Sequence, residues 1–390
     1  MSERKLKAWQ QAGLIDADTV ARIQAWESEH TRPLGIWAMV GLGALAIGLG
    51  IVSVVASNWD AIPGEIRLGI HLALLIAMGV LLWWRLPKTT AGESDYFGDA
   101  MLFVAAVLGL TFFAHVGQVY QTSSPLWQPL LVWIVIFSPL LLLFGRGWPV
   151  AALWMAGVLG TAWAHANEYG GGWFLDRLGG VQPSYPILYW GLIASPPMII
   201  AALAAAARSR SARPIFWRLL EQLAIVTILI ALSIVIITRG WSSQSDHVTG
   251  SSVIQSLFLA GAAGVIYLAR RTRSGEATAA ILGVAAAVHF ALAMVRDLGG
   301  ATHGPWIPAF LFMALWGAVA GGALYAGWRW VFQCAIGLIA VRVIILSFEL
   351  SDDLLGSGAS LIASGLFAIF VAWVSVRISR RYAPSREAEA

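Results

Sequence analysis

Apolar runs long enough to cross a bilayer recur along this chain of 390 residues, and they restrict its fold more than any other feature. A helix crosses the hydrocarbon core with about 20 apolar residues, and there it satisfies its own backbone hydrogen bonds. About twelve segments meet this criterion, and they cover residues 34–57, 66–84, 98–119, 128–144, 149–166, 186–207, 219–238, 251–269, 277–295, 306–326, 330–348 and 357–377. We therefore expect an all-α, polytopic integral membrane helical bundle.

The composition agrees with a membrane protein and excludes a soluble one. Hydrophobic residues make up 58% of the chain and charged residues only 12%, whereas about a quarter of a soluble domain is charged. The basic residues stand between the apolar runs rather than on one face, so the net charge of +4 does not indicate nucleic acid. The single cysteine, Cys334, excludes a disulfide framework.

The placement of arginine predicts the orientation, because cytoplasmic loops of membrane proteins are enriched in Lys and Arg. Three arginine clusters fall on the same side when the twelve segments are threaded: Arg208/Arg210/Arg213/Arg218, Arg270/Arg271/Arg273 and Arg377/Arg380/Arg381. We expect both termini to be cytoplasmic. The lipid bilayer is then the first partner of the chain.

Three regions follow from this threading. Residues 1–32 form an N-terminal element, residues 33–378 the multi-span domain with halves 34–207 and 219–377, and residues 379–390 a polar cytoplasmic tail. Within the first region the spacing of Leu6 and Trp9 and a break at Gly13 predict a short cytoplasmic helical hairpin, with Asp16 or Asp18 capping a second helix that carries Trp26. This hairpin either rests on the membrane or docks a partner protein through Trp9 and Trp26.

Arg342 stands inside an apolar run, "IAVRVIILSFELSDD", with Glu349, Asp352 and Asp353 after it. A central arginine costs about 2.5–3.5 kcal/mol on insertion scales, so it must face protein or water. We expect Arg342 to face the bundle interior, where acids at the outer end of its own or a neighbouring helix hold it. Three roles remain open: a structural ion pair or snorkelling, an anion site at the outer leaflet, and a proton-coupled switch between Arg342 and an acid.

A second polar group, "AHVGQVYQ", places His115, Gln118 and Tyr120 near the outer end of the third segment. His115 and Gln118 share a helix face, whereas Tyr120 points elsewhere. They serve either as interhelical hydrogen bonds or as the lining of a polar vestibule. His71 and His289 have no carboxylate at helical spacing and are expected to be packing residues. No helix carries two metal ligands at suitable spacing, so we expect neither a metal nor a cofactor.

Three motifs together resemble a known family. Residues Trp9 to Ile15 follow W-x-x-x-G-L-I, the first apolar run ends in "NWDAIP", and "FGDAMLFVAAVLGLTFFAHVGQVYQ" contains Gly117, Gln118 and Tyr120 in a G-Q-x-Y arrangement. Over about residues 3–165 the chain resembles a bacterial family of predicted membrane proteins, that of domain of unknown function 2157. The resemblance implies a bacterial inner-membrane protein with a cytoplasmic N-terminal element. It implies no activity, substrate or catalytic residue.

Three functions remain open at this point. The preferred one is a transporter or permease of a small or amphiphilic molecule, because many spans with few large loops usually enclose a path. The second is a non-catalytic scaffold or sensor that recruits a partner through the hairpin. The third, an enzyme acting on a lipid-linked substrate with the acids at Glu349, Asp352 and Asp353, is the weakest because the chain shows no catalytic constellation.

Overall fold

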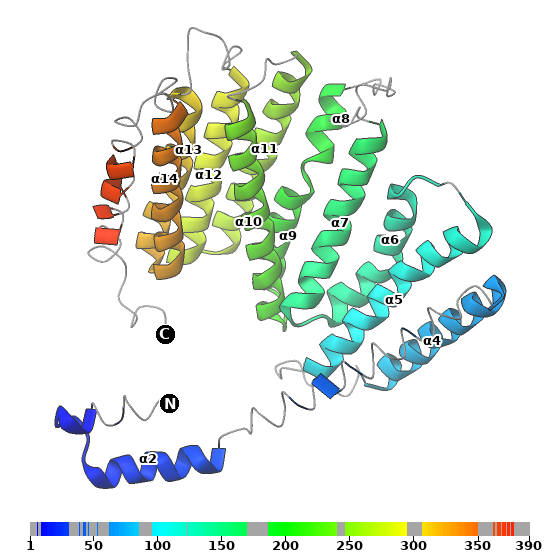
Figure 1. Ribbon diagram of the computed structural model, residues 1–390. Helices are drawn as coiled ribbons and strands as arrows, with labels where there is room; N and C mark the ends of the chain where they lie inside the picture. Colours follow the sequence, from blue (N-terminus) through cyan, green and yellow to red (C-terminus); the bar gives the residue numbers. More distant parts are fainter. Residues whose placement is uncertain are drawn as a thin grey trace. The chain divides into compact units, whose positions relative to one another are not determined.

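A computed structural model describes residues 9–30, 62–85, 96–122, 124–169, 186–239, 246–294 and 306–349, together with isolated positions elsewhere. Every regular element in these ranges is a helix (Figure 1). The chain divides into two compact units, Met1–Arg67 and Leu68–Ala390, and each is considered by itself.

In the first unit a helix ends at Gly13, as the sequence predicts. Gly13 has a φ of 69°, its N–H donates to the carbonyl of Gln10 (3.1 Å), and the N–H of Leu14 donates to that of Trp9 (3.0 Å). These two bonds form a Schellman motif, in which glycine takes the left-handed position without steric cost.

Helix α2 (Ala17–His30) follows that break. Its N-cap is Asp16, whose Oδ1 accepts a hydrogen bond from the Thr19 N–H at 2.9 Å. Asp18 instead forms an exposed ion pair with Arg22. Most of the first arm and the side chain of Trp26 lie outside the described residues, so packing of the two arms as a hairpin stays a prediction.

Eight helices in the described ranges are long and apolar enough to cross a membrane. The helices after α2 are α4 (Gly64–Arg85), α5 (Tyr96–Tyr120), α6 (Trp127–Phe144), α7 (Trp148–Tyr169), α8 (Pro186–Ile193), α9 (Pro196–Arg208), α10 (Pro214–Arg239), α11 (Asp246–Ala269), α12 (Arg273–Met294), α13 (Trp306–Ala326) and α14 (Arg329–Glu349). Helix α7 is not among the eight, and a bent pair of α8 and α9 would make a ninth crossing. Predicted segments 34–57 and 357–377 lie largely outside the described residues, so the number twelve stays a prediction.

The expectation of one continuous helix over 186–207 is wrong. Helix α8 ends at Ile193, α9 begins at Pro196, and the two axes differ by 44°. Pro196 and Pro197 lack the N–H groups that would continue the helix, and proline rings clash with the preceding turn. The Ser195 hydroxyl donates to the Leu192 carbonyl at 2.7 Å and so satisfies a carbonyl at the break.

Two apolar cores hold the second unit together. The larger includes Trp133 of α6, Phe216 of α10 and Leu282 of α12, and the other includes Phe312 and Leu315 of α13. Helix α10 contributes to both cores and packs against α7, α9, α12 and α13.

Four short connections of this unit lie at the same end of the helices (Figure 1). The turns between α6 and α7, α9 and α10, α11 and α12, and α13 and α14 lie at one end. That end, which carries Arg146, Arg208, Arg213, Arg270, Arg271 and Arg329, is called the basic end below.

Candidate functional site

Arg342 lies in α14, and only 4% of it is exposed. The side chain therefore faces protein, as its insertion cost requires. The side chain of Glu349 and residues Asp352 and Asp353 lie outside the described parts of the chain. Pairing of Arg342 with any of these acids stays a prediction.

His115 is buried in α5 and meets His71 of α4, a contact the sequence does not indicate. The two Nδ1 atoms lie 3.3 Å apart, and His71 Nε2 lies 3.0 Å from the Leu108 carbonyl. The Phe112 ring packs edge-on against His71. His71 is therefore a hydrogen-bonded packing residue whose partner comes from the next helix.

Gln118 and Tyr120 are exposed, whereas His115 is buried. Helix α5 packs against α6 and α7, whereas α14 packs against α13. The described structure thus does not bring Arg342 together with His115 in one site.

Two further histidines make polar contacts between helices. Nδ1 of His165 in α7 lies 2.9 Å from the Tyr189 hydroxyl of α8, and Nδ1 of His289 in α12 lies 3.2 Å from the Ser256 hydroxyl of α11. The Ser252 carbonyl is also 3.1 Å from His289 Nδ1. His289 is a hydrogen-bonded packing residue, as expected, whereas His165 was not singled out from the sequence.

The four histidines and Arg342 occupy similar positions along their helices. Each is four to seven residues from the helix end remote from the basic end, which corresponds to roughly 6–11 Å along the helix. We call these five side chains, His71, His115, His165, His289 and Arg342, the polar layer. In the described part of the chain no three His, Cys, Asp or Glu side chains are grouped to hold a metal ion.

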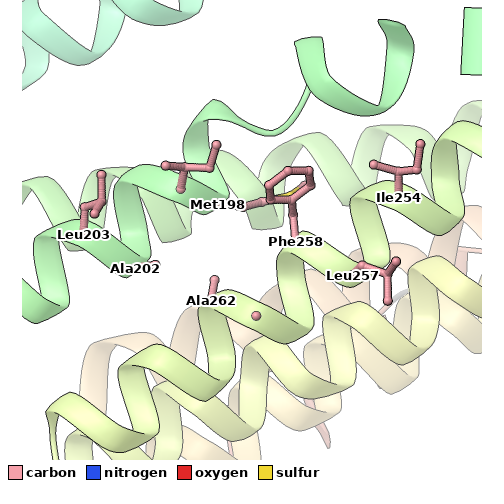
Figure 2. A pocket seen from close by; sticks show the side chains of 9 residues that line it. Met198, Ala202, Leu203, Ile254, Leu257, Phe258 and Ala262 are labelled. Carbon is pink, nitrogen blue, oxygen red and sulfur yellow. The ribbon is translucent and has the colours of Figure 1, made fainter. Parts of the chain in front are cut away.

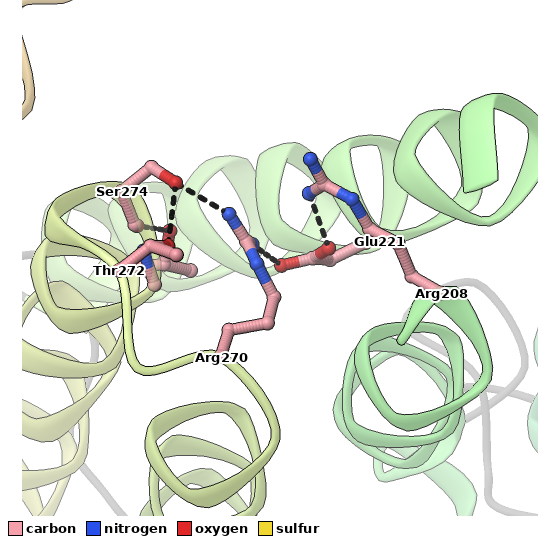
Figure 3. A network of polar contacts seen from close by, with 7 residues as sticks. Arg208, Glu221, Arg270, Thr272 and Ser274 are labelled. Carbon is pink, nitrogen blue, oxygen red and sulfur yellow. Dashed lines mark hydrogen bonds and ion pairs between the residues drawn. The ribbon is translucent and has the colours of Figure 1, made fainter. Parts of the chain in front are cut away.

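A buried acid, Glu221 of α10, organises the basic end (Figure 3). Only 1% of Glu221 is exposed. One carboxylate oxygen accepts a hydrogen bond from Arg208 of α9 at 3.2 Å, and the other pairs closely with Arg270 at the end of α11. Arg270 also donates to the Ser274 hydroxyl at 2.7 Å. One carboxylate thus joins the ends of three consecutive helices, α9, α10 and α11.

Burial lowers the pKa of the Arg270 guanidinium below its ordinary value, while Glu221 acts in the opposite direction. Glu221 is not among the site residues predicted from the sequence. The available signal was a single acid at the start of a predicted span, three residues after Arg218. Its two partners, however, belong to other helices.

A third arginine, Arg213, joins the start of α10 to the end of α6. Its guanidinium donates to the carbonyls of Leu142 and Gly145, each at 2.6 Å. These carbonyls belong to the last turn of a helix, where intrahelical donors are lacking. Burial lowers the pKa of the Arg213 guanidinium. The positive charge of Arg146 lowers this pKa further, whereas the negative charge of Asp99 raises it.

An apolar groove of about 460 Å³ lies between α9 and α11, beside the break between α8 and α9 (Figure 2). Its lining is Met198, Ile199, Ala202, Leu203, Ile254, Leu257, Phe258, Gly261 and Ala262. At the break itself, the Gln255 amide of α11 donates to the Trp190 carbonyl of α8 at 2.9 Å. Helix α11 therefore supports the broken segment of α8 and α9 through a polar contact.

The long apolar helices define a membrane protein with several transmembrane helices. The comparison with known families agrees, since residues 7–150 match the family described as "Predicted membrane protein", domain of unknown function 2157. The resemblance seen in the sequence is thereby confirmed over those residues. No curated protein and no solved structure matches the chain.

Proposed function

We propose that the protein is a permease of the bacterial inner membrane that carries a small or amphiphilic molecule. The supporting observation is the broken helix of α8 and α9, which differ in direction by 44° within an apolar segment. Interrupted helices at membrane depth are tolerated where they are buried or line a cavity, and in secondary transporters they form the substrate site.

The break can act as a hinge because few bonds cross it. Pro196 and Pro197 have no N–H to donate across it, and the contacts there come from Ser195 and from Gln255 of α11. A change in the Gln255 contact would let α8 move against α9. Alternating access moves one helix bundle against another around a fixed site, and a hinge at this break would permit such a movement.

The polar layer supplies side chains for the outer part of the path. In this proposal Arg342 with Glu349, Asp352 and Asp353 forms one polar wall. His115 and Gln118 of α5, with Tyr120 beside them, form a separate polar region, because α5 packs against α6 and α7 whereas α14 packs against α13.

The orientation is part of the proposal: both termini and the basic end face the cytoplasm. A membrane-impermeant thiol reagent tests it in cells whose native Cys334 is replaced by serine. We expect labelling of Ser124→Cys, between α5 and α6, and none of Ser209→Cys at the basic end. Both positions are exposed in the structure. The opposite pattern would invert the assignment.

Transport is tested in two stages. Comparing metabolites and lipids in cells with and without the gene identifies the molecule whose distribution changes. Its movement is then measured with Gln255→Ala, Arg342→Ala and Gln118→Ala, all of which we expect to insert but to lose transport. The control is Val265→Ala, an exposed apolar position on α11. Unchanged transport in all three variants, with Val265→Ala as the reference, contradicts the proposal.

A scaffold or sensor is the second candidate function, supported by the separate compact unit at the N-terminus. Trp9 and Leu14 are exposed there, at 39% and 72%, which leaves apolar surface for a partner protein. Deletion of residues 1–30 would then abolish the cellular phenotype, whereas Arg342→Ala would leave it intact. A permease gives the reverse result.

A further inference from the structure

The groove between α9 and α11 is lined by small and by large apolar residues. Ala202, Gly261 and Ala262 lie along it, while Met198, Leu203 and Phe258 project from the two helices around it (Figure 2). Its volume of about 460 Å³ lies within the range of small-molecule sites. No side chain that lines it is polar, so its occupant must present hydrocarbon there.

Cations cluster where both walls of this groove reach the basic end. Helix α9 ends at Arg208, with Arg210 after it, and α11 is followed by Arg270 and Arg271. Leu203 is five residues before Arg208 and Ala262 is eight before Arg270, so the groove begins roughly 8–12 Å below the cations. This is the separation between a lipid headgroup and the upper part of its acyl chain.

The cations at this end exceed the acids that neutralise them. Glu221 pairs with both Arg208 and Arg270 and so balances one of the two charges. Arg210 and Arg271 are exposed. The Arg271 guanidinium lies over the Tyr267 ring, 4.4 Å from its centre, which orients it beside α11.

We propose that the groove and these arginines together bind one anionic phospholipid from the leaflet at the basic end. One acyl chain lies in the groove between α9 and α11, and the phosphate lies between Arg210 and Arg271. Basic sites between transmembrane helices recognise anionic headgroups in this way. The proposal concerns lipid recognition and stands whether or not the protein is a permease.

Charge complementarity selects the anionic class of lipid. A zwitterionic lipid has a chain of the same shape, but it brings no net charge to the arginines. Removal of one arginine near the surface weakens binding of an anionic lipid by about fivefold, since each contributes about 1 kcal/mol. Binding of a zwitterionic lipid should change much less.

Two glycines of α11 provide a matched test. An added Cβ would meet nothing within 4 Å at either Gly261 or Gly264, but only Gly261 lines the groove. A phenylalanine at position 261 should therefore fill the groove without disturbing the helix packing, and one at 264 should leave it open.

The experiment uses the full chain purified in mild detergent, with native mass spectrometry to count bound lipids. We expect dioleoyl phosphatidylglycerol to bind more tightly than dioleoyl phosphatidylcholine. Gly261→Phe should abolish this binding, Gly264→Phe should retain it, and the double variant Arg210→Gln/Arg271→Gln should lose most of the preference. Melting temperatures confirm that each variant folds. If Gly261→Phe fails to fold, Gly261→Leu takes its place.

Three results would overturn the proposal. Equal binding of both lipids removes the headgroup argument, and full binding to folded Gly261→Phe removes the groove. Millimolar glycerol phosphate could also compete with the lipid while Gly261→Phe leaves lipid binding unchanged. That result would show a site for free phosphate instead of a lipid site. A change in oligomeric state of Gly261→Phe, without a change in lipid binding, would show that a second copy occupies the groove.

Discussion

The Nδ1 atoms of His71 and His115 lie 3.3 Å apart, so one ring donates a hydrogen bond to the other. The Leu108 carbonyl can only accept, so His71 Nε2, 3.0 Å away, carries the hydrogen. In the neutral ring His71 Nδ1 is then the acceptor, and His115 Nδ1 carries the shared proton. The surrounding network thus assigns opposite tautomers to the two histidines.

Replacing His71 with alanine should loosen the contact between α4 and α5. Hydrogen bonds between membrane helices contribute about 0.6 kcal/mol on average and at most about 1.7 kcal/mol, so we expect a loss of unfolding free energy in this range. Thermal unfolding in detergent measures it, and Leu74→Ala, at a 53% exposed position of α4, is the control. Equal effects of the two variants would mean that the histidine pair contributes nothing specific.

Glu221→Gln should be far more damaging, because it leaves two arginines beside each other without the acid between them. Breaking a buried ion pair by removing one partner costs about 3–5 kcal/mol. The control is Glu276→Gln, because the Glu276 carboxylate accepts a hydrogen bond from Tyr325 at an exposed position. A small loss for Glu221→Gln, comparable to that of the control, would show that the three helices are held mainly by apolar packing.

Protonation of Asp16 should weaken the start of α2. Hydrogen bonds from Thr19, first from its side chain and then from its N–H, lower the pKa of Asp16 below its ordinary value of 3.8. The capping contribution is therefore present above the unfolded pKa and is lost as the pH falls through the lower, folded value. Over that pH range, amide hydrogen exchange in α2 should become faster in the native protein than in the Asp16→Asn variant. The asparagine side chain accepts the same hydrogen bond but does not titrate. Identical pH profiles for both proteins would contradict this.

Sequence periodicity predicted where the helices lie but not which faces meet. All ten predicted segments between residues 66 and 348 contain helix, because an apolar run of that length has few other structures in a membrane. A helix that is apolar all round, however, gives no signal for its rotation, so the contacts of His71 with His115 and of Glu221 with Arg270 could not be predicted. The break at Ser195 was visible in the proline pair, yet the apolar run around it suggested one span.

Gly157 of α7 tests how closely α6 and α7 approach. A Cβ added there would overlap Cζ3 of Trp133. The Trp133 ring is fully buried and donates from Nε1 to the Ala106 carbonyl at 2.7 Å. The ring cannot move aside without losing that bond, so Gly157→Ala should destabilise the protein by about 1–3 kcal/mol, as overpacking does. Gly160→Ala, one turn on, would place its Cβ 3.9 Å from Leu130, an ordinary contact. Thermal unfolding should separate the two variants, and equal melting temperatures would show that α6 and α7 lie farther apart than this packing requires.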